Sequence, residues 1–181
     1  MESLRGNVLV ASPGLLDPNF HRAVLLLVEH GEEGALGVVL NRPSSAEVTE
    51  AAPPLAELVD PGDVIHVGGP VDPEAVLILA ELEDPSEAAS LVFDDVGLLA
   101  AEGDPALWAA AARRARVFAG YAGWAAGQLE GELEEEAWIL EPARAGDVFT
   151  HAPEDLWAEV LRRKGGQYEL LARMPPDPSV N

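Results

Sequence analysis

Short apolar runs rich in valine and leucine are the feature of this sequence that most restricts its fold. Three such runs, Asn7–Ser12, Ala23–His30 and Ala35–Asn41, follow one another near the N-terminus. Runs of this length and composition are typical of β-strands. The connection between the second and third, His-Gly-Glu-Glu-Gly at residues 30–34, carries two glycines and predicts a hairpin turn. An antiparallel pair of strands is therefore expected.

Further strands and three helices complete the expected secondary structure. The other strand candidates are Val64–Val67, Ala75–Leu82, Ser90–Phe93, Val117–Trp124 and Ala137–Leu140. Helices are predicted over Ser45–Val59, Pro105–Arg114 and Pro153–Lys164, and the last has apolar residues at helical spacing. So many strands exclude an all-helical protein, and together with the helices they predict an α/β fold.

The length of the chain, 181 residues, suits one domain. We expect this domain to span residues 1–165, and residues 166–181, which include Met-Pro-Pro-Asp-Pro, to form a loosely held C-terminal tail. The longest unbroken apolar segment, Ala23–Val28, is too short to cross a bilayer, and the N-terminus has no signal-peptide pattern. A cytoplasmic protein without membrane association is expected, and nothing indicates its oligomeric state.

The charge and the cysteine content exclude several classes of function. Acidic residues number 32 against 11 basic ones, and because proteins bind phosphate backbones through Lys and Arg, we expect no direct nucleic-acid binding. The basic clusters at 113–116 and 162–164 are each predicted to lie in the last turn of a helix, where cations interact favourably with the negative end of the helix dipole. The chain has no cysteine, and its four histidines lack metal-ligand spacing, so no metal site and no cofactor are predicted.

Two predicted strand ends carry residues suited to binding a ligand. Asn41 and Arg42 follow one strand, and Pro43 stops the hydrogen bonding of that strand to its neighbour. The Arg42 guanidinium group is therefore presented at the strand end. Gly68 and Gly69 follow another strand, and glycine allows backbone N–H groups to approach a ligand closely. Taken alone, Gly-Gly-Pro more often forms a tight turn than a ligand cradle.

A glycine-rich stretch, residues 120–133, supplies the remaining candidates. Gly120 and Gly123 are expected to let a strand bend or another backbone approach, and Gly127 is expected to serve a turn before a helix. Trp124 and Gln128 then lie at a strand-to-helix junction, where α/β proteins commonly bind ligands.

We predict that Gln128 joins Arg42 and the Gly68-Gly69 backbone in one pocket for a small anionic or polar ligand. The alternative, weighted about equally, is that Arg42 pairs with a carboxylate such as Glu29 and only stabilises the fold.

A non-catalytic regulatory or binding module, acting through such a ligand or a protein partner, is the function that these residues favour. The alternative is a hydrolase or other small-molecule enzyme that uses His30, Glu29 or Ser12. Ser12 has no GxSxG motif around it, although a triad with His30 and Asp17 can be written. An enzyme requires such groups to converge within hydrogen-bond reach, whereas a binding module requires only donors and a shaped cavity.

Six motifs occur in order along the chain: Leu-Val-Ala-Ser-Pro (9–13), Asp-Pro-Asn-Phe (17–20), Val-Glu-His (28–30), Gly-Ala-Leu-Gly-Val-Val-Leu-Asn-Arg-Pro (34–43), Gly-Gly-Pro (68–70), and Gly-Tyr-Ala-Gly-Trp (120–124) with Gly-Gln-Leu-Glu (127–130). In this order and over nearly the whole chain they resemble the YqgE/AlgH family of bacterial proteins. The resemblance implies a single-domain cytosolic α/β protein with a mixed, largely antiparallel, curled sheet flanked by helices. The family name implies a regulatory role, often written as transcriptional regulator, and no established reaction comes with it.

Two departures from the family pattern bear on chemistry. Val28 stands where relatives carry a cysteine before Glu-His, and Ala23 stands where a serine or threonine is common. A mechanism that depends on either side chain is therefore not carried over to this chain. No helix-turn-helix with a basic recognition helix can be located in the sequence either.

Overall fold

The predicted hairpin lies in the first half of a ten-stranded sheet. The computed structural model describes residues 2–100 and 102–175. The hairpin strands β2 (Val24–Gly31) and β3 (Gly34–Val39) pair antiparallel, and β1 (Asn7–Ala11) and β10 (Trp138–Pro142) extend the sheet in the order β10-β1-β2-β3. The predicted antiparallel pair is confirmed.

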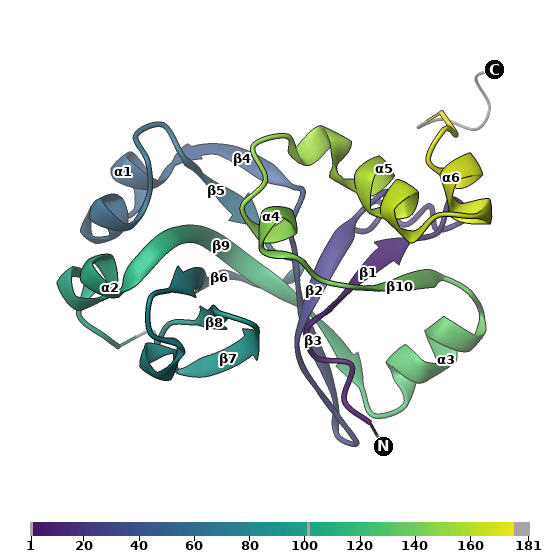
Figure 1. The fold of residues 1–181 in the computed structure, drawn as a ribbon, viewed down its shortest axis with the longest axis horizontal. Helices are drawn as coiled ribbons and strands as arrows, with labels where there is room; N and C mark the ends of the chain where they lie inside the picture. Colours follow the sequence, from purple (N-terminus) through teal and green to yellow (C-terminus); the bar gives the residue numbers. More distant parts are fainter. Residues whose placement is uncertain (1, 101, 176–181) are drawn as a thin grey trace.

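Both faces of β1 and β2 are buried, which explains why their apolar runs are continuous rather than alternating. Val8 and Val10 pack toward α4 (Ala145–Val148) and α5 (Pro153–Lys164), whereas Leu9 and Ala11 face the core that contains Leu129 of α3 (Gln128–Glu134). Figure 1 shows α4 and α5 on one side of this half of the sheet and α3 on the other.

The long strand β9 (Ala112–Ala125) joins the two halves of the sheet (Figure 1). Its last residues pair with β3 and the rest pairs with β6 (Val71–Leu82), which continues to β8 (Val96–Leu98) and β7 (Ser90–Phe93). Strand β5 (Val64–Val67) lies parallel to β9 and antiparallel to β4 (Pro43–Glu47). The sheet is thus mixed, largely antiparallel and open, in a single-domain α/β fold flanked by helices, as the sequence predicts.

Glycine at position 120 allows β9 to pass from one half of the sheet to the other. Gly120 has a φ of +77°, in the left-handed region, and a Cβ there would lie 2.6 Å from the carbonyl oxygen of Gly69. A Cβ on Gly68 would in turn meet the carbonyl oxygen of Gly120. These glycines therefore form a crossing of two backbones with no room for side chains, and their first role is structural.

The helix predicted over Ser45–Val59 is wrong. Strand β4 covers its beginning, and it is followed by the single turn α1 (Val48–Ala51) and the 3-10 helix η1 (Pro53–Leu58). Pro53 and Pro54 lack backbone N–H groups, so a continuous α-helix would lose its hydrogen bonds here. The strands β4 and β8 are also absent from the prediction, because each has only three to five residues and weak apolar patterning.

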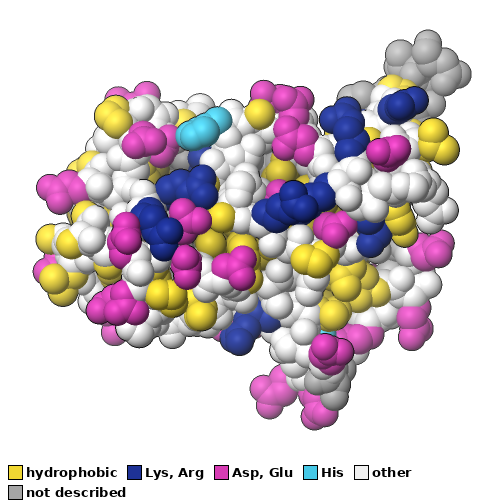
Figure 2. Space-filling view, viewed as in Figure 1, with side chains coloured by type: hydrophobic (Ala, Val, Ile, Leu, Met, Phe, Trp, Pro, Cys, Tyr) yellow, Lys and Arg dark blue, Asp and Glu magenta, His cyan; other side chains and the backbone are white. Residues whose placement is uncertain are grey.

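The predicted helix over Pro105–Arg114 ends early, as α2 (Pro105–Ala111), and the basic cluster after it lies in β9. Arg114 pairs with Glu81 on the neighbouring strand, with 3.2 Å between Nε and Oε1. Arg116 donates to the carbonyl oxygen of Thr150 at 2.6 Å. The helix-end explanation is therefore wrong for this cluster, although it is confirmed for residues 162–164 in the last turn of α5. Figure 2 shows the cations of the visible face in small groups among many acidic side chains.

The first part of the predicted C-terminal tail is helical. Helix α6 (Gln167–Leu171) packs beside α5, and Ala172 is buried in the same core as α5. Residues 176–181 of the predicted tail lie outside the described residues. Within the part of the chain that is described, no helix is long and apolar enough to cross a membrane.

Candidate functional site

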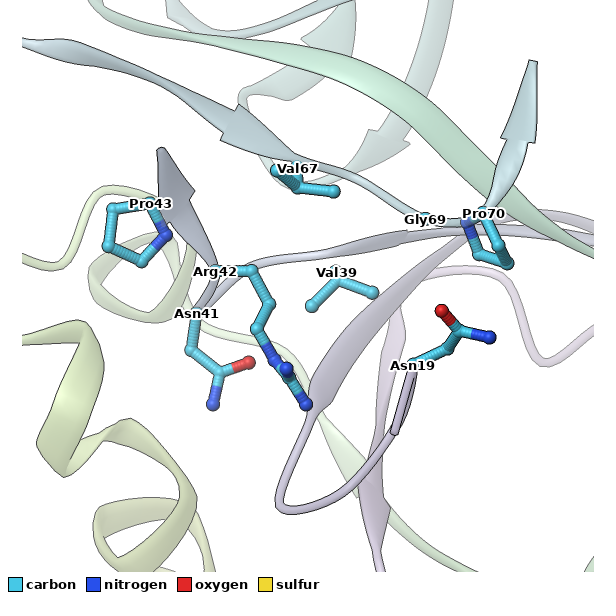
Figure 3. Close-up of a pocket in the computed structure, with 8 residues that line it drawn as sticks. All are labelled: Asn19, Val39, Asn41, Arg42, Pro43, Val67, Gly69 and Pro70. Carbon is cyan, nitrogen blue, oxygen red and sulfur yellow. The ribbon is translucent and has the colours of Figure 1, made fainter. Parts of the chain in front are cut away.

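The candidate site is a pocket of about 340 Å³ where β3 and β5 end. Its lining consists of Asn19, Val39, Asn41, Arg42, Pro43, Val67, Gly69 and Pro70. Figure 3 shows the Arg42 side chain extending from the strand end toward the loop that carries Asn19. The structure therefore brings three of the predicted site residues, Asn41, Arg42 and Gly69, to one cavity.

Arg42 has a charged group that no carboxylate of the described residues neutralises directly. One of its terminal nitrogens donates to the carbonyl oxygen of His21 at 2.6 Å. No salt bridge of Arg42 occurs among residues 2–100 and 102–175. The predicted alternative, a stabilising ion pair with a carboxylate such as Glu29, is therefore wrong. Glu29 lies near the turn of the β2–β3 hairpin and lines a different cavity.

Asn41 holds the pocket together through its side chain. Its Oδ1 accepts a hydrogen bond from the backbone N–H of Val24 at 3.0 Å, and its Nδ2 donates to the carbonyl oxygen of Arg22 at 2.9 Å. Both ends of the amide are therefore engaged, one by the first residue of β2 and the other by the loop before it. Asn41 thus fixes the position of Arg42 and the facing loop.

The backbone of Gly68 is also engaged within the fold. Its N–H donates to the carbonyl oxygen of Ala119 at 2.8 Å, and its own carbonyl accepts from the N–H of Val39 at 2.8 Å. Gly68 therefore has no free N–H to donate to a ligand. The close backbone contacts with β9 explain why glycine occurs at both positions 68 and 69.

Asn19 is the polar lining residue that was not predicted from the sequence. The carboxylate of Asp17 accepts a hydrogen bond from the Asn19 backbone N–H at 2.8 Å, which shapes the loop as an Asx turn. Figure 3 shows the Asn19 amide on the side of the cavity opposite Pro43. The signal for this residue was local, an Asp-Pro-Asn turn, but nothing in the sequence places that turn beside Arg42.

Trp124 and Gln128 lie outside this pocket. The Trp124 ring is buried against Trp138 at a centroid distance of 6.3 Å, and the indole N–H groups of both residues donate to Glu132. Gln128 accepts a hydrogen bond from the N–H of Ala125 at 3.0 Å and thereby closes the turn before α3. The prediction that Gln128 and Arg42 share one pocket is therefore wrong.

The structure places the residues of the enzyme alternative in two separate cavities. His30 and Glu29 line a cavity at the β2–β3 turn, whereas Ser12 lines another between β10 and α6. The Nδ1 atom of His30 accepts from the N–H of Leu4 at 2.9 Å, so its Nε2 carries the proton and donates to Glu130 at 2.7 Å. Both ring nitrogens therefore serve the fold. The described residues contain no group of three or more histidines and carboxylates placed to hold a metal ion.

His66 is a buried histidine in the strand that borders the pocket. It pairs with Pro43 across β4 and β5, and its ring lies 5.8 Å from that of Phe118. The Nδ1 atom lies 3.2 Å from the carbonyl oxygen of Val64. Burial, aided by the charge of Arg116, lowers the pKa of His66 to about 4.

We expect His66 to make the protein less stable in mild acid. Since its pKa is about 4 in the folded state and 6.5 in the unfolded chain, the unfolded state binds more protons between these values. The free energy of unfolding should therefore lose about 2–3 kcal/mol through this residue as the pH falls from 6.5 toward 4. Urea unfolding of the parent and His66→Asn at several pH values isolates this contribution, because acidic groups affect both proteins. Equal pH slopes for the two proteins would contradict the assignment.

The fold and the pocket define a single-domain α/β protein with an open, largely antiparallel sheet and a ligand-sized cavity at a strand end. The chain belongs to the AlgH-like family (DUF179), whose model matches residues 8–169. The sequence resemblance to the YqgE/AlgH family is thus confirmed. The family is one of uncertain function.

Relatives and solved structures agree with this assignment. A UPF0301 protein of Streptomyces coelicolor is 46% identical over 187 residues, covering 100% of this chain and 97% of that protein. A UPF0301 protein of Thermobifida fusca is 44% identical and covers 99% and 96%. The crystal structure of a Corynebacterium diphtheriae protein superposes with a TM-score of 0.88 at 29% identity, covering 95% and 93%. The solution structure of AlgH from Pseudomonas aeruginosa has a TM-score of 0.73 at 32% identity, covering 96% and 95%.

Proposed function

We propose that this protein is a non-catalytic binding module of the cytoplasm that takes a small anionic ligand in the Arg42 pocket. The observation that carries the proposal is an arginine that lines a cavity and has no carboxylate partner among the described residues. A partly buried guanidinium is costly without a counter-charge, and its planar fork suits a carboxylate or phosphate group. A bound anion would supply the missing charge.

The walls of the pocket restrict the ligand further. Val39, Val67, Pro43 and Pro70 offer apolar surface, and the Asn19 amide offers one polar group in addition to Arg42. A small carboxylate or phosphate that carries a short apolar group fits this combination best. Nucleic acid remains an unfavourable partner, because the net charge of the chain is −21 and a field of that sign repels a polyanion.

The loop that faces Arg42 supports a preformed site. Asn41 holds the carbonyl oxygen of Arg22, and the Arg22 guanidinium carbon lies 4.0 Å from the ring centroid of Trp157. The same loop also provides the His21 carbonyl oxygen that orients Arg42. Fewer groups then need to be ordered when a ligand binds, which favours affinity. In this proposal, ligand occupancy is the signal that gives the module its regulatory role.

A ligand screen by thermal unfolding tests the proposal. We expect at least one small carboxylate or organic phosphate to raise the Tm of the parent, since a ligand at 100 times its Kd stabilises a protein by about 2.7 kcal/mol. Arg42→Ala should remove this response and remain folded. Arg42→Lys should retain only part of it, because an ammonium group keeps the charge but loses the bidentate fork.

Gln128→Ala provides the matched control, because Gln128 closes a turn outside the pocket. It should keep the full ligand response. A panel without any response at millimolar concentrations, or a response that persists unchanged in Arg42→Ala, would refute the proposed function.

A further inference from the structure

A second cavity, of about 450 Å³, lies between β10 and α6 and shares no lining residue with the Arg42 pocket. Its apolar part is formed by Leu133, Trp138, Ile139, Leu140 and Leu171. Its polar part comes from Ser12 at the end of β1, Glu136 after α3, Lys164 at the end of α5, and Gln167 and Tyr168 of α6. Polar and apolar side chains thus contribute about equally to the lining, which suits a ligand that carries both charged and apolar groups.

Lys164 and Glu136 give this cavity two opposite charges that are not paired with each other. The Lys164 ammonium group donates to the carbonyl oxygen of Leu140 at 2.8 Å and lies 5.1 Å from the ring centroid of Tyr168. Neither residue forms a salt bridge with any other residue in the described part of the chain. The neighbouring Arg163, by contrast, is engaged by Asp147. Both residues are exposed, so the cavity offers a solvent-accessible cation and anion at its edge.

Both charged residues are unusual choices at their positions. Lys164 is the only lysine in a chain that otherwise uses arginine for its cations. Glu136 has a φ of +59° at the position after α3, where glycine is the residue without backbone strain. The N–H groups of Glu136 and Ala137 cap α3 on the carbonyl oxygens of Leu133 and Glu132, so the backbone conformation serves the helix end. The choice of glutamate rather than glycine there is the feature that the cavity would explain.

We propose that this cavity binds a zwitterion, namely an amino acid or short peptide with an apolar side chain. Its ammonium group would pair with Glu136, and its carboxylate with Lys164. The side chain of the ligand would cover Trp138, Leu140 and Leu171. This proposal is independent of the Arg42 pocket, so either one can fail alone.

The single lysine makes a direct measurement possible. Reductive methylation with ¹³C-formaldehyde keeps the charge of Lys164 and gives one lysine signal by NMR, separate from that of the N-terminal amine. We expect leucine or the dipeptide Leu-Leu to shift this signal saturably, and the ligand with the lower apparent Kd identifies the size of the site. The analogues 4-methylpentanoate and 3-methylbutylamine each keep one charge of leucine, and each should bind at least about tenfold more weakly.

Three variants connect the binding to the two charges. We expect Lys164→Gln and Glu136→Gln each to weaken binding by about tenfold or more. Binding to Lys164→Gln, which has no lysine signal, is measured by calorimetric titration. Glu136→Gln should not affect the binding of 4-methylpentanoate, which has no ammonium group. Glu136→Gly should raise the Tm by about 2 °C through relief of strain and still lose binding of the zwitterion, which separates the ligand role from a folding defect.

Arg42→Ala serves as the control for the other pocket and should leave these titrations unchanged. A Lys164 signal that does not shift with either zwitterion up to tens of millimolar would overturn the proposal. Equal affinity for leucine and 4-methylpentanoate would also overturn it, because the site would then recognise an anion alone.

Discussion

Replacement of Gly120 by alanine is expected to lower the free energy of unfolding by about 3 kcal/mol or more. Two effects add at this position. Alanine is strained at a φ of +77°, and its Cβ would lie 2.6 Å from the carbonyl oxygen of Gly69 and 3.2 Å from that of Val71. Because these obstacles are backbone atoms, one in the Gly68-Gly69 connection and one in β6, neither can move without disturbing the junction of the two half-sheets. The Tm should fall by roughly 6 °C or more, measurable by thermal or urea unfolding.

Gly123→Ala is the matched control three residues further along the same strand. A Cβ on Gly123 meets nothing within 4 Å, and the residue is not in the left-handed region. The change should therefore alter the free energy of unfolding by less than about 1 kcal/mol. Similar losses of unfolding free energy for both variants would show that the close backbone contact is not the reason for glycine at position 120.

Replacement of Asp147 by alanine is the second change for which we expect a large loss, about 3–5 kcal/mol. Asp147 and Arg163 form two parallel hydrogen bonds of 2.8 Å, and Asp147 also accepts from the N–H of Arg144 at 2.9 Å. Their side chains are only 6% and 16% exposed. Its hydrogen bonds to Asp147 raise the pKa of Arg163, and removal of the carboxylate would leave a mostly buried guanidinium without its counter-charge.

The exposed pair Arg113–Asp95 provides the comparison. Its side chains are 40% and 46% exposed, so Asp95→Ala should cost no more than about 1 kcal/mol. The double variant Asp147→Leu, Arg163→Met should recover much of the loss, because it removes both charges together. Urea unfolding at neutral pH measures all three. A cost for Asp147→Ala no larger than that for Asp95→Ala would contradict a buried, mutually dependent pair.

The two pockets have different relations to the sequence. Asn41 and Arg42 could be selected from the sequence alone, because a strand followed by proline presents its last side chains at a sheet edge. Lys164 and Glu136 had no such signal. The cavity that they line is completed by residues of α6, and α6 was expected to be part of a loosely held tail.

Local pattern determined much of the fold. The apolar runs of β1, β2 and β3 specified buried strands, the two glycines between β2 and β3 specified a hairpin, and helical spacing specified α5 within its observed bounds. The order of motifs also determined the family. Each of these properties depends on residues close together in the chain, where alternation, turn chemistry and capping act directly.

Only the tertiary structure decided which strand ends share a pocket and what each glycine does. Pairing of β9 with β6 overrode the helical pattern before Arg114, because a strand gains its hydrogen bonds and burial from partners that are distant in sequence. The same long-range packing placed Asn19 and the His21 carbonyl beside Arg42 and put Trp124 and Gln128 elsewhere. Contacts of this kind depend on how β9 crosses the Gly68-Gly69 backbone, and a residue pattern read along one chain segment carries no information about that crossing.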